Sequence, residues 1–277
     1  MAPRAQSLIL DLLSAVGGRP VPVRALVRAA AVFGIEENAL RVALARLLSA
    51  GKLEQAERGA YGLSSRSRAV QDHVTSWSTL HERVVAWRGG WVAVHVGALG
   101  RAQRSAVRRR ERALEFLGCA ELDPGLWLRP DNLAGGVGAT RRALRELGLD
   151  GAALVARLEE LEPASERRAR SLWDGRALER AYHETRRELE QSGARLDALP
   201  LEQAVAECFV LGGKAIRQLA FDPLLPEPIV SADARQALVS EMRAYDRAGR
   251  RVWRRFMRAE GAPALESVLD FRSVEAT

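Results

Sequence analysis

Residues 37–63 read ENALRVALARLLSAGKLEQAERGAYGL. Leucines and alanines recur every three or four residues in the first half, which predicts a helix from Glu37 to Ser49 with one apolar side. Gly51 follows at a position where helices commonly end. Beyond it, two short alternating segments flank a turn that contains Gly59, which is typical of a β-hairpin. These segments are Lys52 to Ala56 and Ala60 to Leu63.

The residues before this stretch predict two further helices. Apolar positions at helical spacing mark Ser7 to Val16 and Val23 to Val32, and Pro20 and Pro22 bracket a short extended piece between them. Three closely connected helices followed by a hairpin is the order of a winged helix-turn-helix. Residues 1–68 also hold ten Lys or Arg against five Asp or Glu, which is most of the chain's net charge of +7. A basic domain of this kind is typical of nucleic-acid binding.

The third helix has a second side that suits the major groove of duplex DNA. At about 100° per residue, small or short side chains lie opposite the leucine stripe, and Arg41 and Arg46 lie on the two rims. Such a face can approach base edges closely, while guanidinium groups reach phosphates or guanine. Arg58 would lie at the tip of the wing. The predicted DNA-binding residues are Arg24, Asn38, Arg41, Val42, Ala45, Arg46, Lys52, Arg58 and Tyr61.

The run LRVALARLLSAGKLE followed by RGAYGLS resembles the N-terminal signature of PaaX, the repressor family of phenylacetic acid degradation. Later landmarks of that family have counterparts in the same order: WRGGWVAVHV, RRRERALEFLGCAELDPGLWLRP, SLWD and FDPLLPEPIV. The resemblance covers nearly the whole chain. It implies a dimeric repressor of an aromatic-acid catabolic operon, released from its operator by phenylacetyl-CoA or a related acyl-CoA. It also implies a ferredoxin-like middle domain and a helical C-terminal region.

The residues of the middle region support that architecture independently. A strand at Trp91 to Val96, a helix at Arg101 to Leu117, two short strands around Asp123-Pro124-Gly125, a helix and a last strand give the order βαββαβ. We therefore predict an α+β protein: a winged helix-turn-helix at 1–66, a helical linker at 67–88, a ferredoxin-like domain at 89–163 and a helical domain at 164–277. The last part contains three predicted helices, near Leu172 to Gln191, Leu201 to Phe221 and Ala232 to Met257.

Two other functions of a βαββαβ unit have little support in the sequence. An RNA-recognition module needs paired aromatic residues on its central strands, and these are missing. A metal-dependent nuclease needs carboxylates where the first strand ends, yet Trp91 to Leu99 contains no Asp or Glu. The four histidines fall on unrelated segments, and no catalytic motif is present. The prediction is a ligand-responsive regulator and not an enzyme, with a nucleic-acid-processing enzyme as the alternative.

Several features leave more than one interpretation open. The arginines between Arg101 and Arg112 could bind DNA phosphate, bind a ligand phosphate or simply solvate a helix. Gly135 to Gly138 could hold a coenzyme A phosphate or form a plain turn. The ligand-binding residues stay unknown at this point, and no cofactor or metal is expected. Cys119 and Cys208 are expected to be buried free thiols, since no second cysteine lies near either of them in the sequence.

The location and partners follow from what the sequence lacks and from the resemblance. No stretch is long and apolar enough to span a membrane, and Asp11 interrupts the apolar run at the start, which argues against a signal peptide. A cytoplasmic protein is expected. Its expected partners are double-stranded operator DNA, a small-molecule effector and a second copy of the chain in a homodimer.

Overall fold

The computed structural model describes residues 3–15, 20–56, 59–65, 67, 76–97, 99 and 104–259. The protein is an α+β protein whose chain forms two compact units. Unit 1 consists of Met1–Ser78, Thr185–Ala220 and Val239–Thr277, and unit 2 of Thr79–Glu184 and Phe221–Leu238. None of the helices in the described ranges is long and apolar enough to cross a membrane.

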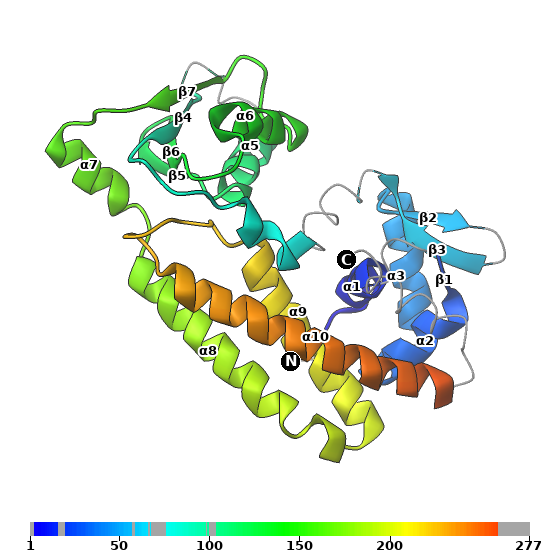
Figure 1. The fold of residues 1–277 in the computed structure, drawn as a ribbon. Coiled ribbons are helices and arrows are strands. Elements are labelled where there is room, and N and C mark those ends of the chain that lie inside the picture. Colours follow the sequence, from blue (N-terminus) through cyan, green and yellow to red (C-terminus); the bar gives the residue numbers. More distant parts are fainter. Residues whose placement is uncertain are drawn as a thin grey trace. The chain divides into compact units, whose positions relative to one another are not determined.

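The N-terminal part of unit 1 has the three helices and the hairpin that the sequence predicts (Figure 1). Leu8, Leu26 and Leu40, one from each helix, are almost completely buried in a common apolar core. The strands form an antiparallel sheet in the order β1-β3-β2, with Tyr61 of β3 opposite both Val21 and Gln55. The elements are α1 (Ala5–Ala15), β1 (Val21–Pro22), α2 (Val23–Ala31), α3 (Glu37–Ser49), β2 (Leu53–Ala56) and β3 (Ala60–Leu63).

Unit 2 contains an antiparallel four-stranded sheet in the order β5-β6-β4-β7. Its elements follow one another in the predicted order, with two helices inserted between strands. They are β4 (Trp91–His95), α5 (Arg104–Phe116), β5 (Ala120–Asp123), β6 (Leu126–Pro130), α6 (Gly136–Glu146) and β7 (Leu154–Leu158). The apolar strand β4 lies in the middle of the sheet, where β6 and β7 pair with its two edges.

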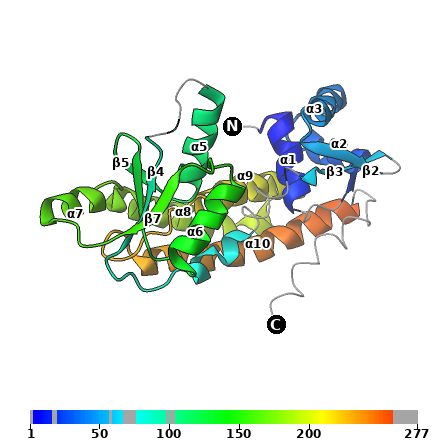
Figure 2. The same cartoon turned by 90° about the horizontal axis from the view of Figure 1, so that it is seen from above.

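The two faces of this sheet pack against different helices (Figure 2). Because side chains alternate along a strand, Val92 and Val94 point to one face, where they pack with Leu114 and Leu144 of α5 and α6. Trp91 points to the other face and packs with Ala169 of α7 (Pro163–Arg170). The Trp91 indole donates a hydrogen bond of 2.9 Å to Glu166, which is also on α7. The sheet is therefore covered on both sides.

The helical linker predicted at 67–88 is not a continuous α-helix over residues 76–88, the longest part of it that the structure describes. Residues 76–88 contain two short 3₁₀ turns, η2 (Ser76–Ser78) and η3 (Leu80–Arg83), followed by extended backbone. The reason is long-range pairing of the backbone, since Val84 forms a β-bridge with Leu133 and the Val85 amide donates to the Asn132 carbonyl at 2.8 Å. These bonds replace the local ones that a helix would need. The prediction for residues 68–75 falls outside the described residues.

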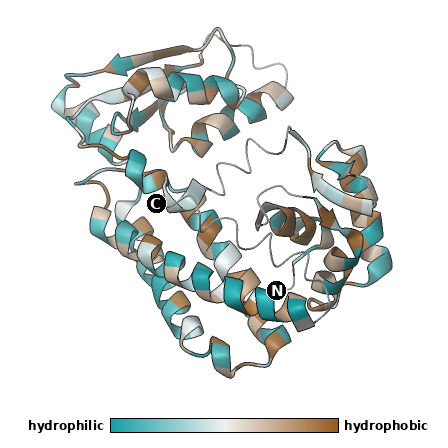
Figure 3. Cartoon of the chain, turned by 45° about the vertical axis from the view of Figure 1, so that its right-hand side comes forward, coloured by the Kyte–Doolittle hydropathy of each residue, from teal (hydrophilic) through white to brown (hydrophobic). Residues whose placement is uncertain are grey.

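The remaining helices are α8 (Gly175–Gly193), the 3₁₀ turn η4 (Leu196–Ala198), α9 (Leu201–Ala220) and α10 (Ala232–Ala259). Polar and apolar residues alternate along them, as expected for helices with one buried side (Figure 3). Asp174 caps the start of α8 by accepting a 2.9 Å hydrogen bond from the Ala177 amide. This cap explains why α8 begins later than the predicted Leu172. Helix α7 was not predicted at all.

The proline-rich segment, residues 221–230, belongs to unit 2 and is buried in part, at Asp222, at residues 224–226 and at Val230. The Tyr182 hydroxyl donates a hydrogen bond to the carboxylate of Asp222, and the Leu224 amide donates to Asp222 Oδ1 at 2.7 Å. Arg235 of α10 lies 3.8 Å from the same oxygen and donates to the Leu225 carbonyl at 2.9 Å. Burial raises the pKa of the Tyr182 hydroxyl, which keeps its proton and remains the donor.

The sheet also contacts the proline-rich segment through a buried chain of hydrogen bonds. Arg129 of β6 is almost completely buried and donates to the Leu117 carbonyl, to the Pro130 carbonyl at 3.2 Å and to Asn132 Oδ1 at 3.1 Å. Asn132 in turn donates to the Leu224 carbonyl at 2.7 Å. Burial lowers the pKa of Arg129, and three acceptors offset the loss of water around its guanidinium group.

The two thiols allow a test of the packing. Cys119 and Cys208 are buried and free, and burial raises the pKa of both to about 11. At pH 8 only about 0.1% of each thiol would be ionised, compared with roughly a quarter for an exposed cysteine. We expect the native protein to resist iodoacetamide at pH 8 and to take up two labels in urea, as measured by intact mass. Rapid labelling of either thiol without urea would contradict this burial.

Candidate nucleic-acid interface

Helix α3 presents two chemically different sides. Leu40, Ala43, Leu44 and Leu47 are at most 5% exposed and fix the helix to the core. The opposite side consists of Asn38, Val42, Ala45 and Ser49, all exposed to solvent. Val42 is 44% exposed although it is apolar, so the core does not account for its position. A flat, open helix face with short side chains can approach the edges of base pairs.

The two rim arginines differ in their surroundings. The Arg41 guanidinium donates to Glu37 Oε1 from Nε at 2.8 Å and from Nη2 at 2.6 Å, one helical turn away. Both side chains are more than half exposed, at 57% and 53%, so the pair contributes only about 0.3–0.5 kcal/mol and can exchange for a phosphate. The Arg46 side chain is exposed and makes no hydrogen bond or ion pair with any residue that the structure describes.

The other predicted DNA-binding residues lie around this face. Arg24 on α2 and Lys52 directly after α3 are exposed, whereas Tyr61 in the central strand β3 is half-buried. Arg58 lies outside the described residues, and its predicted place at the tip of the hairpin stays a prediction. Sequence reasoning overlooked the Glu37–Arg41 pair, although acid and base four residues apart on a helix are a recognisable signal for it.

The N-terminal part is connected to the C-terminal helices of unit 1 by aromatic and ionic contacts. The rings of Phe33 after α2 and Phe209 of α9 have centroids 5.2 Å apart, and Trp253 of α10 lies 6.3 Å beyond Phe209. Arg217 of α9 also lies 3.5 Å from the Asp11 carboxylate of α1. A displacement of α9 would therefore change the positions of the helices that pack against α3.

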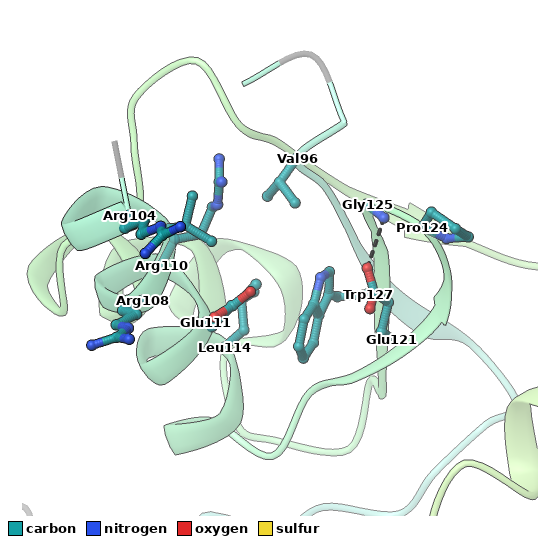
Figure 4. A pocket seen from close by; sticks show the side chains of 11 residues that line it. Val96, Arg104, Arg108, Arg110, Glu111, Leu114, Glu121, Pro124, Gly125 and Trp127 are labelled. Atoms are coloured by element: carbon teal, nitrogen blue, oxygen red, sulfur yellow. Dashed lines mark hydrogen bonds between the residues drawn. The ribbon is translucent and has the colours of Figure 1, made fainter. Parts of the chain in front are cut away.

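The arginines between Arg104 and Arg112 of α5 lie in different surroundings. Arg104, Arg108 and Arg110 line a cavity next to the β5–β6 hairpin (Figure 4). Arg109 lies beside Gly148, because a Cβ on that glycine would be 3.2 Å from Arg109 Cδ. Arg112 is exposed, and Arg101 lies outside the described residues.

The glycine-rich turn before α6 faces a carboxylate. Gly135 caps the helix in a left-handed conformation with φ +82°. A Cβ on Gly136 would be 3.4 Å from Asp131 Oδ1, and Asp131 also lies 3.7 Å from Arg157. The start of α6 therefore has a negative side chain beside it, which disfavours a phosphate there.

Comparisons with known proteins identify the family of the chain. Residues 4–67 match the family described as PaaX-like protein, and residues 173–255 match the PaaX-like protein C-terminal domain. The chain is similar in structure to the uncharacterized protein Rv0674 from Mycobacterium tuberculosis, with 26% sequence identity and a TM-score of 0.56. That match covers 90% of this chain and 98% of the mycobacterial one. No curated protein sequence matches the chain significantly. With both of its domain models matched in order, the chain belongs to the PaaX-like protein family.

Proposed function

We propose that this protein is a DNA-binding transcriptional regulator that reads duplex DNA with α3. In this proposal α1–α3 and β1–β3 form a winged helix-turn-helix, and β4–β7 with α5 and α6 form a ferredoxin-like domain. The observation that carries the proposal is the exposed side of α3, where Val42 and Ala45 lie between two exposed arginines. Membership of the PaaX-like family supports a regulator in preference to an enzyme.

The regulator acts, in this proposal, as a homodimeric repressor of an aromatic-acid catabolic operon and is released by an aryl-acyl-CoA. A dimer binds half-sites about 34–36 Å apart, or a multiple of that distance, so a modest change in the spacing of two α3 helices costs several contacts at once. The contacts of Phe33 with Phe209 and of Asp11 with Arg217 are a route by which the C-terminal helices could alter that spacing. A ligand that binds the displaced form better would release the operator.

Arg46→Ala should weaken DNA binding by about 5- to 150-fold, which corresponds to roughly 1–3 kcal/mol for one arginine contact to a base. Duplexes selected from a random pool with the wild-type protein supply the binding site, and fluorescence anisotropy at several salt concentrations measures the affinity. Arg41→Ala should have a smaller effect, because Arg41 must first leave Glu37. Glu37→Gln should strengthen binding, since it removes a negative charge from the same face.

Arg142→Ala is the matched control, because Arg142 is an exposed arginine on α6, far along the chain from α3. It removes the same charge and should change the affinity less than twofold. Equal losses in Arg142→Ala and Arg46→Ala would show a general charge effect and contradict the assignment to α3. Failure of the wild-type protein to select any duplex would contradict the proposed function itself.

A further inference from the structure

A cavity of about 520 Å³ lies in unit 2 between α5 and the β5–β6 hairpin. Its helix side is formed by residues spaced three or four apart, which places them on one face of α5. Its other side is formed by Val96 after β4, Glu121 of β5, the Pro124-Gly125 turn and Trp127 of β6 (Figure 4). A volume of this size is within the range of small-molecule sites, about 300–1,000 Å³.

Among the described residues, one buried cation of the cavity has no charged or hydrogen-bonding partner. Arg110 is only 9% exposed, and its guanidinium group makes no hydrogen bond or ion pair within the described part of the chain. A buried charge without a partner is costly, so this arginine is available for an anion. Arg104 and Arg108 line the same cavity and are exposed at its edge.

The two acids of the lining do not neutralise Arg110. Glu121 Oε1 accepts a 2.8 Å hydrogen bond from the Gly125 amide, which holds it on the hairpin (Figure 4). Glu111 is exposed and forms no ion pair with Arg110. Three arginines against two glutamates leave the cavity with a net positive lining.

The inner part of the cavity is apolar and aromatic. Leu114 is fully buried and Val96 is 8% exposed, and both belong to the core on this side of the sheet. Trp127 is half-buried and packs against the same core. A planar apolar group would find an indole ring beside it, and an attached anion would find Arg110.

We propose that this cavity binds a small organic anion, a carboxylate or phosphate attached to a planar apolar group, with Arg110 holding the anion and Trp127 contacting the apolar group. The inference does not depend on the proposed function, because the anion would bind this cavity whether or not the protein binds DNA. The exposed Arg104 and Arg108 attract the anion to the opening. Removing the Arg110 charge should weaken binding far more than it changes the fold.

Isothermal titration of the full-length protein with phenylacetate, phenyl phosphate and inorganic phosphate tests the site. We expect Arg110→Met to weaken binding of the preferred aryl anion by about 10- to 150-fold, as for the loss of a hydrogen bond to a charged group. Arg112→Met is the control: it removes an exposed charge from the same helix outside the cavity and should change binding less than twofold. Trp127→Leu should reduce the preference for phenyl phosphate over inorganic phosphate, whatever its effect on total affinity.

The probes distinguish a phosphate from a carboxylate as the anionic group of the ligand. Arg110-dependent binding of phenyl phosphate supports a phosphorylated ligand, and Arg110-dependent binding of phenylacetate supports a free carboxylate. The inference is overturned if neither aryl anion binds, or if Arg110→Met binds as tightly as wild type. Urea unfolding of the variant checks that it is folded. The selected DNA duplex is bound independently of these titrations, so loss of wild-type DNA binding counts against the proposed function and not against the cavity.

Discussion

Replacing Asp222 by alanine is expected to lower the free energy of unfolding by about 3–5 kcal/mol, the cost of removing one partner from a buried ion pair. The Asp222 side chain is 1% exposed and the Arg235 side chain is 4% exposed, so water solvates neither charge. The substitution also leaves the Tyr182 hydroxyl and the Leu224 amide without their acceptor. Urea unfolding, followed by circular dichroism and tryptophan fluorescence together, measures the loss and reveals whether the two units unfold separately.

Asp197→Ala is the control for an exposed ion pair. Asp197 lies 4.0 Å from Arg255, and the two side chains are 91% and 62% exposed, so its removal should cost less than about 1 kcal/mol. Asp222→Asn keeps one acceptor oxygen, which can preserve one of the two hydrogen bonds, and should lose less stability than Asp222→Ala. If Asp222→Ala were no less stable than Asp197→Ala, the buried cluster would not hold the proline-rich segment in place.

The proline-rich segment also shows where sequence reasoning was incomplete. Prolines at 223, 226 and 228 correctly predict that no helix continues from α9 into α10. They give no indication that half of the segment is buried, because its partners Asn132 and Tyr182 are distant along the chain. Local periodicity detects helices and strands, whereas burial of irregular backbone depends on hydrogen bonds between distant residues.

The candidate DNA-binding face was more predictable than the cavity for the same reason. All residues of the α3 face lie within one helix, so the helical period alone separates the buried leucines from Val42 and Ala45. The cavity brings together α5 and a hairpin formed later in the chain, and the sequence left three interpretations of its arginines open. Only the packing of unit 2 separates Arg110, which lines the cavity, from Arg109 and Arg112.

Gly118→Ala is the second substitution expected to have a large effect, with a loss of about 2–5 kcal/mol in the free energy of unfolding. Gly118 has φ +70°, and a Cβ at this position would lie 2.7 Å from the Cα and 2.8 Å from the carbonyl oxygen of Pro223. The left-handed conformation costs a residue with a Cβ about 1–2 kcal/mol, and overpacking against fixed backbone adds about 1–3 kcal/mol. Pro223 cannot move away freely, because the neighbouring Asp222 and Leu224 are held by the buried hydrogen bonds.

Gly89→Ala, in the same unit, separates the backbone strain expected in Gly118→Ala from the clash with Pro223. Gly89 has φ +85° with nothing within 4 Å of its Cβ position, so alanine there incurs the backbone strain without the clash. We expect a loss of about 1–2 kcal/mol for Gly89→Ala in the same urea experiment. The difference between the two variants measures how firmly the proline-rich segment is packed against the end of α5. Equal losses would mean that the segment yields to an added methyl group, and that Asp222 and Asn132 restrain it less than their hydrogen bonds indicate.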